Sequence, residues 1–281
     1  MFKNVKYYAG LLDSDGSITL HVHKTSRNTF FCYPKITFSQ ITHRNFIFKS
    51  FCDYYSVEIC ETSRFDKRTG KTYESSSVSL TGTKARSFLN EVKQHLVIKK
   101  DLAEFLLSIS GEEVSQEVLN EYRSNIKILR DSKTLSDKNF PSRKWMAGYI
   151  DGDGHIGSSF RKRDGNLSFS ITITSNINDP QGIYLINRVF GGYIVTSENT
   201  LRLIVPLTNI TKAEEFITYF NSHLILKKPQ FDFVLSVLRK GEHRIRKGAT
   251  YESNLAIHKK LQELKKPQRL SDKPAEAEAI V

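Results

Sequence analysis

Residues 145–157 read WMAGYIDGDGHIG, and this stretch decides the fold because residues 7–17 carry the related stretch YYAGLLDSDGS. Both copies contain Ala-Gly, two apolar residues and then Asp-x-Asp-Gly. The small Ala-Gly residues would let two short helices pack closely, and the glycine that closes each copy is a natural place for a helix to stop. The repeated stretch therefore predicts two helices that pack against each other.

The acidic residues at the ends of these helices predict a metal site. If the helices pack side by side, Asp15 and Asp153 lie together at two helix C-termini. A helix C-terminus already carries partial negative charge, so two carboxylates there are unfavourable on their own. A divalent cation would relieve this conflict, and paired carboxylates that hold such ions are common where phosphodiesters are cut.

The acidic stretches fit two simpler structures less well. An ordinary pair of helices ending in Asp-rich turns would account for one copy, but not for two copies with the same spacing. A calcium-binding EF-hand loop requires Gly at its sixth position and Glu at its twelfth. Counting from Asp13 gives Ile18 and Lys24, and the second copy fails both tests in the same way.

The composition favours a basic protein that is large enough for two domains. The 281 residues carry a formal net charge of +12, which favours a polyanionic partner, either nucleic acid or an anionic membrane. No stretch approaches the roughly 20 apolar residues that cross a bilayer. The three cysteines lack CxxC spacing and indicate neutral thiols in a reducing compartment. We expect an intracellular protein without a membrane partner, in an organelle (mitochondrion or chloroplast) or a bacterial cytoplasm.

The first half alternates helices with pairs of strands. Alternating apolar and polar residues predict half-buried strands, with Ile36 and Phe38 facing the core. The expected strands are 17–24, 30–39, 56–64 and 72–80, and the expected helices are 3–14, 43–55, 83–94 and one that starts near Lys99.

The second half repeats this order with shorter turns. Its expected strands are 155–162, 167–175, 192–197 and 200–206, and its expected helices are 142–152, 178–190, 209–221, 228–240 and 251–266. The domains expected from this plan are a first repeat over 1–112, a linker over 113–140, a second repeat over 141–242, and a basic C-terminal helix with a disordered tail over 243–281.

The stretches YAGLLDSDG and MAGYIDGDG resemble the two motifs of a single-chain LAGLIDADG homing endonuclease. Tyr8, Met146 and Tyr149 stand where the motif has Leu, and none of these departures touches an acidic position. The resemblance implies an α+β fold of tandem αββαββα LAGLIDADG repeats with pseudo-twofold symmetry. In that fold, two antiparallel sheets form a saddle over the DNA.

The resemblance also implies roles for the motif residues. Asp15 and Asp153 would be the metal-binding catalytic acids, and the backbone carbonyls of Ser14 and Gly152 would help to hold the metals. The earlier acid of each motif would be mainly structural. The implied metal is Mg2+, with Mn2+ or Ca2+ able to substitute for it in binding.

Two further pairs of residues recur near the motifs. Lys99 and Lys227 each follow an apolar triplet at the start of a helix, where a cation opposes the helix dipole. One such lysine would be a solvated surface residue, but two copies match the family's basic residue near the active site, which stabilises charge on the phosphate or organises the attacking water. Gln40 and Asn176 end the second strand of each half and match a polar residue that positions water, although a turn residue would also account for Asn176.

The outward faces of the strands are the expected DNA-binding surface, because a two-stranded ribbon fits the major groove. Polar residues cover the outer face of any half-buried sheet, so the face is predicted rather than any single contact. In the first half the candidates are Thr19, His21, His23, Tyr33, Lys35, Thr37, Arg64 and Tyr73. In the second half they are His155, Arg161, Arg163, Ser168, Ser170, Thr172, Thr174 and Arg202.

The implied function is that of a monomeric endonuclease encoded within an intron or intein. It would make a double-strand break with short 3′ overhangs in a long, non-palindromic double-stranded DNA target, by metal-dependent phosphodiester hydrolysis. Two other functions stay open. An RNA maturase on the same fold would bind its host intron RNA and help it to splice. A DNA-binding regulator without catalysis would be expected to lose acids or to gain a helix-turn-helix domain, and the sequence shows neither.

Overall fold

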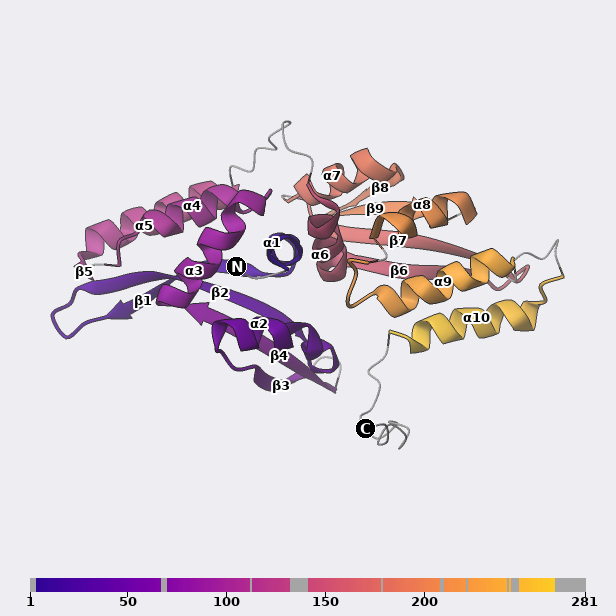
Figure 1. Cartoon of the computed structure of the whole chain (residues 1–281), viewed down its shortest axis with the longest axis horizontal. Coiled ribbons are helices and arrows are strands. Elements are labelled where there is room, and N and C mark those ends of the chain that lie inside the picture. Colours follow the sequence, from indigo (N-terminus) through magenta and orange to yellow (C-terminus); the bar gives the residue numbers. More distant parts are fainter. Residues whose placement is uncertain are drawn as a thin grey trace, which may run out of the picture.

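The computed structural model describes residues 4–66, 70–111, 113–131, 141–177, 179–207, 210–220, 222–241, 243 and 248–265. Within them, two halves lie next to each other, each with an antiparallel sheet and packed helices (Figure 1). None of the helices in these ranges is long and apolar enough to cross a membrane. The tail over 267–281, which we expected to be disordered, lies outside the described residues.

The first half follows the expected order of helix, strand pair, helix, strand pair and helix. Its sheet has the strand order β1-β2-β4-β3, and a short strand, β5, pairs with β2. The elements are α1 (Val5–Asp13), β1 (Ser17–Lys24), β2 (Phe30–Ile41), η1 (Thr42–Phe48), α2 (Lys49–Tyr55), β3 (Cys60–Asp66), β4 (Lys71–Thr81), α3 (Gly82–Val92), η2 (Lys93–His95), α4 (Lys100–Ser108), β5 (Glu113–Val114) and α5 (Gln116–Asp131).

The second half repeats the same plan, which confirms the duplicated α+β fold. Its sheet has the order β6-β7-β9-β8, equivalent to that of the first sheet. The elements are α6 (Arg143–Asp153), β6 (Gly154–Arg161), β7 (Asn166–Asn176), α7 (Gln181–Phe190), β8 (Tyr193–Ser197), β9 (Thr200–Pro206), α8 (Ile210–Phe220), α9 (Lys228–Lys240) and α10 (Tyr251–Glu263).

Two elements of the first half differ from the expected ones. The strand expected from residue 56 begins at Cys60, because Ser56 adopts a left-handed conformation (φ 51°) that ends α2 and turns the chain. The helix expected over 43–55 starts as the 3-10 helix η1 and becomes α-helical only at Lys49.

Part of the expected linker belongs to the first half instead. Strand β5 pairs with the start of β2, and α5 packs on α4. Helix α5 is held there by apolar side chains at helical spacing, of which Leu119 and Ile126 are buried. Burial of this stripe explains why α5 packs on the first half.

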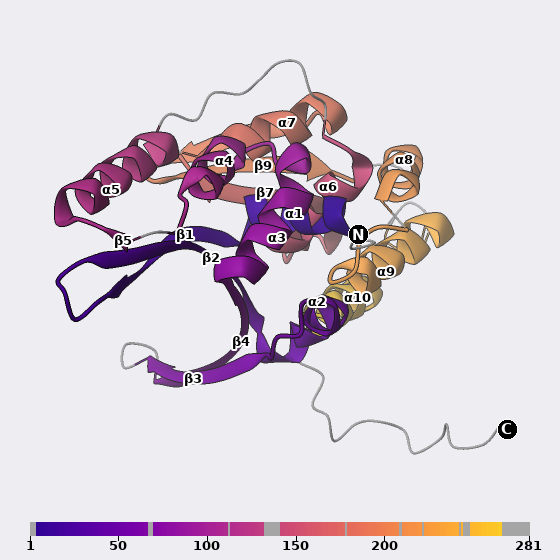
Figure 2. The ribbon, with the colours of Figure 1, turned by 60° about the vertical axis from the view of Figure 1, so that its left-hand side comes forward.

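Alternation along the strands gives each sheet one buried and one outward face. Ile36 and Phe38 of β2 are buried as expected, and Ile171 is buried in the matching strand β7. Tyr8 of the motif helix joins the first core, with its ring centroid 5.0 Å from that of Phe51 and 5.8 Å from that of Phe38. These contacts with β2 and α2 therefore fix the motif helix α1 on the first core. The first sheet is also strongly curved along β2 and β4 (Figure 2).

Helices α1 and α6 pack backbone against backbone at the junction of the two halves. A Cβ atom at Gly10 would lie 1.9 Å from the carbonyl oxygen of Trp145, and one at Gly148 would lie 2.0 Å from that of Tyr7. Both distances are far inside van der Waals contact, so only glycine fits at these positions. The close approach expected from the Ala-Gly pairs is confirmed.

The glycines that close the motifs are needed for a different reason from the one expected. Neither Gly16 nor Gly154 has the positive φ of a common helix C-cap. A Cβ atom at Gly16 would instead lie 2.7 Å from the Cα of Leu12, and one at Gly154 would lie 2.5 Å from the carbonyl oxygen of Ile150. The chain turns back so tightly over the last helical turn that no side chain fits there.

Candidate active site and nucleic-acid interface

The first acid of the first motif is buried and joins three parts of the chain. Asp13 accepts hydrogen bonds from the backbone N–H groups of Val97 and Lys99, both at 2.8 Å, and so caps the start of α4. Trp145 of the other half donates its indole N–H to the same carboxylate at 2.8 Å. Burial raises the pKa of Asp13, while Lys99 and these donors oppose the rise.

The second motif repeats this arrangement. Asp151 accepts hydrogen bonds from the backbone N–H groups of Ile225, Leu226 and Lys227 at 2.7, 3.0 and 3.0 Å, at the start of α9. The hydroxyl of Tyr7, from the first half, donates to it at 2.9 Å. Each early acid therefore ties its motif helix to a later helix and to the opposite half, which agrees with a structural role.

Lys99 and Lys227 are the N-caps of α4 and α9, but their side chains turn back to the motif helices. Lys99 Nζ donates to the carbonyl oxygen of Ser14, and Lys227 Nζ to that of Gly152, each at 3.3 Å. Both also donate to neighbouring carbonyls at the same helix ends. An ammonium group at a helix C-terminus is favourable, so this contact offsets the unfavourable position at the start of the next helix.

The two lysines differ in their burial. Lys227 is only 6% exposed, whereas Lys99 is half-buried. Burial lowers the pKa of Lys227 to about 8, and the carboxylate of Asp151 opposes this change. The second motif turn is therefore the more enclosed of the two.

Asp15 and Asp153, the expected catalytic acids, meet at the junction. The two turns are in contact, because a Cβ atom at Gly152 would lie 2.1 Å from Ser14 Oγ and 3.3 Å from the backbone nitrogen of Asp15. Burial and then the charge of Asp15 raise the pKa of Asp153 to about 7, although two lysines oppose the rise. The two carboxylates repel each other, as expected for paired helix ends, and a cation between them would be favourable.

Gln40 contacts Asp15, but the residue expected to be its counterpart in the second half, Asn176, lies elsewhere. Gln40 Nε2 donates to Asp15 Oδ2 at 2.9 Å, from the same face of β2 as the buried Phe38. The equivalence of Gln40 with Asn176 is wrong by one residue, because the strand registers align Gln40 with Ser175. Side chains alternate between the faces of a strand, so Asn176 lies on the opposite, outward face of β7.

Tyr149 contacts Asp153, and the sequence patterns did not predict this contact. Its hydroxyl donates a hydrogen bond to Asp153, and the side chain is only 1% exposed. The ring stacks on that of Trp145 with centroids 5.1 Å apart. A Cβ atom at Gly182 would lie 2.1 Å from the Tyr149 hydroxyl, so glycine there makes room for it. The sequence signal that could have identified Tyr149 is its departure from the motif, since Leu11 occupies the matching position in the first copy.

The candidate DNA contacts of the first half share the outward face of its sheet. The register places Thr19 opposite Lys35 and His21 opposite Tyr33, and residues directly opposite each other point to one side. Alternation of hydroxyl and apolar residues along β4 could have identified further members. The face also contains His23, Thr37, Arg64 and Tyr73, together with the unpredicted Ser75, Ser77, Ser79 and Thr81.

The second half presents most of its candidates in the same way. His155 lies opposite Thr172, and Thr174 lies opposite Arg202. Arg163 is the exception, because β6 ends at Arg161 and Arg163 lies in the turn that follows. The remaining candidates on this face are Arg161, Ser168 and Ser170.

Comparison with known proteins gives one family match, which lies in the second half of the chain. Residues 146–237, from α6 into α9, match the family described as LAGLIDADG endonuclease. This match covers most of the second half of the chain. The first half carries the other copy of the motif and the same strand order. A search of curated proteins returned no match.

Solved LAGLIDADG structures share the whole two-half fold. A double lysine-to-alanine mutant of I-SmaMI has a TM-score of 0.68 at 16% identity, over 92% of this chain and 97% of that one. I-GzeII in complex with its DNA target has a TM-score of 0.64 at 15% identity, over 96% and 99%. I-CpaMI bound to uncleaved DNA has a TM-score of 0.62 at 15% identity, over 91% and 98%. At these identities the likeness shows the fold.

The LAGLIDADG turns could hold a metal only with help from other oxygen atoms. The described ranges contain no group of three or more His, Cys, Asp or Glu side chains that could bind one. Carbonyl groups, water and substrate oxygens would have to complete the shell around Asp15 and Asp153. Such a donor set fits magnesium, which usually keeps several waters and is held by one or two carboxylates plus phosphate oxygens.

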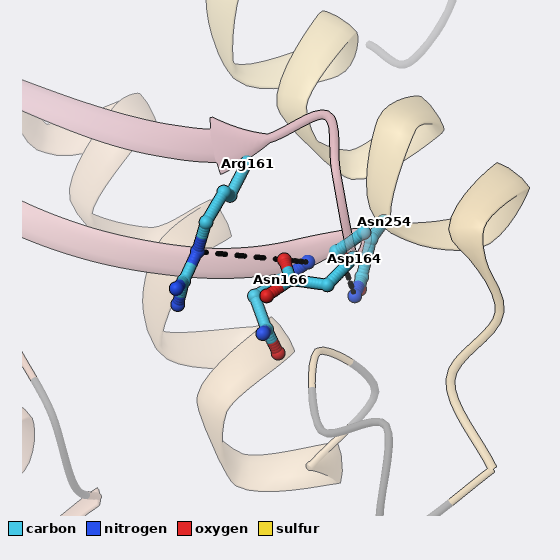
Figure 3. Close-up of polar contacts among 5 residues, drawn as sticks. Arg161, Asp164, Asn166 and Asn254 are labelled. Carbon is cyan, nitrogen blue, oxygen red and sulfur yellow. Dashed lines mark hydrogen bonds and ion pairs between the residues drawn. The ribbon is translucent and has the colours of Figure 1, made fainter.

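The turn that carries Arg163 is anchored to α10. Asn254, which is fully buried, donates to the carbonyl oxygen of Gly165 at 2.8 Å, and Arg161 pairs with Asp164 at 3.4 Å (Figure 3). The Arg161 side chain is 61% exposed, and such surface ion pairs contribute at most about 1 kcal/mol. Arg161 can therefore exchange Asp164 for an anionic or polar partner at little cost.

Helix α10, expected over 251–266, covers β6 and brings a further cation to the outward face. Ser158 Oγ and His258 Nδ1 share a hydrogen bond of 2.8 Å between strand and helix. Just beyond the helix, Lys265 Nζ lies 3.0 Å from His155 Nε2, next to the second LAGLIDADG turn. Burial and then the charge of Lys265 lower the pKa of His155, which favours a neutral imidazole that accepts this bond.

Proposed function

We propose that this LAGLIDADG chain is a homing endonuclease that makes a double-strand break with short 3′ overhangs in a long, non-palindromic DNA target. The observation that carries the proposal is the meeting of the two motif turns, with Asp15 and Asp153 between two outward sheet faces. One chain offers an acid for each strand and a sheet for each half-site, so we propose a monomer. Among structural neighbours, I-GzeII was solved with its DNA target and I-SmaMI with cleaved DNA.

The proposed cofactor is Mg2+, held by Asp15 and Asp153 and by the carbonyl groups of Ser14 and Gly152. Each carbonyl also accepts a hydrogen bond from a lysine, which its two lone pairs permit. Such an ion supplies an activated water and neutralises charge on the phosphate. Mn2+ or Ca2+ would substitute in binding, and I-SmaMI was solved with uncleaved DNA in the presence of calcium ions.

The residues around the acids would hold them in place and supply positive charge. Gln40 fixes the orientation of the Asp15 carboxylate through its 2.9 Å hydrogen bond. Lys99 and Lys227 fix the carbonyl groups of both turns and put ammonium groups beside the position of the scissile phosphates. In a partly buried site such fixed charges stabilise developing negative charge more strongly than solvent does.

A cleavage experiment on recovered DNA tests the proposal. Repeated rounds of binding in Ca2+ to a randomised duplex library would recover the preferred duplex, and Mg2+ would then start cleavage. We expect both strands to be cut with 3′ overhangs, and a chelator to stop the reaction. A protein that binds no duplex, or binds one and cuts neither strand, would overturn the proposal.

The same duplex tests the asymmetry of the two halves. Their outward faces differ, so a palindrome built from either half-site should be cut less well than the native target. Each mismatched base pair costs about 1–3 kcal/mol in such interfaces. The competition must use one salt concentration, because phosphate contacts set much of the affinity. Equal cutting of the native target and both palindromes would show that the two faces do not discriminate.

Lys227→Met and Lys99→Met are expected to slow cleavage more than they weaken binding. Each ammonium group touches a motif turn rather than the outward strand face, so its charge acts on the reacting phosphate. We expect the single-turnover rate to fall on the order of 10²-fold. Lys265→Met is the control, because that lysine lies on the outward face and should affect affinity more than rate. Weaker binding with an unchanged rate would make Lys99 and Lys227 plain DNA contacts.

A further inference from the structure

The outward face of the second sheet carries an apolar strip formed by Tyr193, Val195 and Ile204. Tyr193 lies directly opposite Ile204, so both side chains leave the sheet on one side. Ile204 lies opposite Thr172, and Val195 lies opposite Arg202. Thr172 and Arg202 are both candidate DNA contacts on the outward face. The apolar strip is therefore part of the proposed DNA-binding surface.

Core packing does not explain the apolar strip. Tyr193 is 53% exposed and Val195 is 44% exposed, while Ile204 is partly exposed. The neighbours of Ile204 along β9, Leu203 and Val205, face the other way and are buried. Exposure of apolar surface to water is unfavourable, and a cluster of such side chains commonly marks a binding surface.

The shared fold does not require the apolar strip either. When the two sheets are aligned by strand register, Ser79 of the first sheet occupies the position of Ile204 in the second. Cys60 likewise occupies the position of Val195. The first sheet thus has no aliphatic side chain at either of these two positions, so the shared fold does not require Val195 or Ile204 there.

We infer that the apolar strip contacts the C5-methyl groups of thymines, and so makes the second half-site select thymine at the base pairs that it covers. This inference rests on the proposed function. Among the four bases only thymine presents a methyl group in the major groove. Tyr193, Val195 and Ile204 offer apolar surface to cover such methyl groups, and Arg202 lies among them to bind a phosphate or a guanine.

DNA fits the surroundings of the apolar strip better than a second copy of this chain does. His155, Thr172 and Arg202 border it, and the whole chain carries a net charge of +12. A stable protein–protein interface buries about 800 Å² on each partner, more than three side chains provide. A copy of the chain is therefore the alternative occupant, and oligomeric state in solution distinguishes it from DNA.

The test replaces thymine by uracil, which removes the methyl group and keeps base pairing. The recovered duplex would be made with uracil in one half-site at a time, and binding would be measured in Ca2+ by fluorescence anisotropy at fixed salt. Burial of one methyl group corresponds to about a fourfold change in affinity. We expect about a fourfold loss for each contacted thymine in one half-site, and a smaller loss in the other.

Two variants test whether the apolar strip causes the loss of affinity for the uracil duplex. The double variant Val195→Thr, Ile204→Thr keeps β-branched side chains, each with one methyl group, but replaces the rest of their apolar surface by hydroxyl groups, so its uracil effect should be smaller than that of the wild type. Ser79→Thr, at the matching position of the first half, should keep the wild-type uracil effect. Thermal unfolding would verify that both variants are folded.

The outcomes separate the inference from the proposed function. Wild-type protein that cuts its target but binds the thymine and uracil duplexes equally would overturn the inference alone. Protein that binds no duplex would overturn the proposed function as well. Absence of a uracil effect, together with a dimer in solution that the Val195→Thr, Ile204→Thr variant abolishes, would assign the strip to a second copy of the chain.

Discussion

Replacement of Asp15 or Asp153 by asparagine is expected to abolish double-strand cleavage and to leave DNA binding largely intact. An amide cannot replace a carboxylate in holding a divalent ion beside a phosphate, so the single-turnover rate should fall on the order of 10³-fold or more. Binding should persist because both acids lie on the motif turns, away from the outward strand faces. Loss of a negative charge near the phosphates also favours binding. Cleavage and anisotropy measured on the same duplex would separate the two effects.

Asp101→Asn is the matched control for these variants. Asp101 is an exposed acid in the first turn of α4, close in sequence to Lys99, and it should be replaceable without loss of cleavage. Complete cutting by the double variant Asp15→Asn, Asp153→Asn would rule out the assignment of the two acids as metal ligands.

Gly148→Ala is expected to destabilise the protein, opposite to the usual effect of replacing a glycine in a helix. In an exposed helix alanine is favoured over glycine by about 1 kcal/mol. At Gly148 the new Cβ atom would lie 2.0 Å from the carbonyl oxygen of Tyr7 and 2.9 Å from the backbone nitrogen of Leu11. Backbone atoms cannot rotate away, so α1 and α6 must separate, at a cost of about 1–3 kcal/mol or more. Urea denaturation, followed by the fluorescence of Trp145, the sole tryptophan, would measure the loss.

The same variant should also lose cleavage, because each motif helix carries one of the two acids. Ser124→Ala, on the exposed side of α5, is the control and should leave both stability and cleavage unchanged. If Gly148→Ala were as stable as the wild type, the two motif helices could not be in backbone contact.

Local patterns were sufficient to predict most elements of the fold. Strand β1 has both ends where the alternation placed them, at Ser17 and Lys24. The close packing of α1 and α6 also followed from composition, because Ala-Gly on an apolar helix face leaves room for little else. Periodicity reports which residues are buried together within one element, and that depends on neighbours only a few positions away.

Patterns failed where a contact depended on another element. Nothing local marks Glu113 and Val114 as a strand, because β5 exists only through its pairing with the start of β2. The pattern puts Arg163 on a strand face because it cannot show where the hairpin turns. It pairs Asn176 with Gln40 because both are polar residues that follow a serine at a strand end.

The sequence by itself determined the two motif helices, their αββαββα surroundings and the acids at the junction, because all of these follow from short repeated patterns. Only the tertiary structure decided what touches each acid, with Gln40 at Asp15 and Tyr149 at Asp153. It also turned the lysines back onto the motif turns, through contacts that span more than 70 positions of the chain. The contact of Gln40 depends on strand register, because a shift of one residue keeps the alternation of a strand while exchanging its two faces. The lysine contacts depend on how α4 and α9 pack on the motif helices, which no local pattern reports.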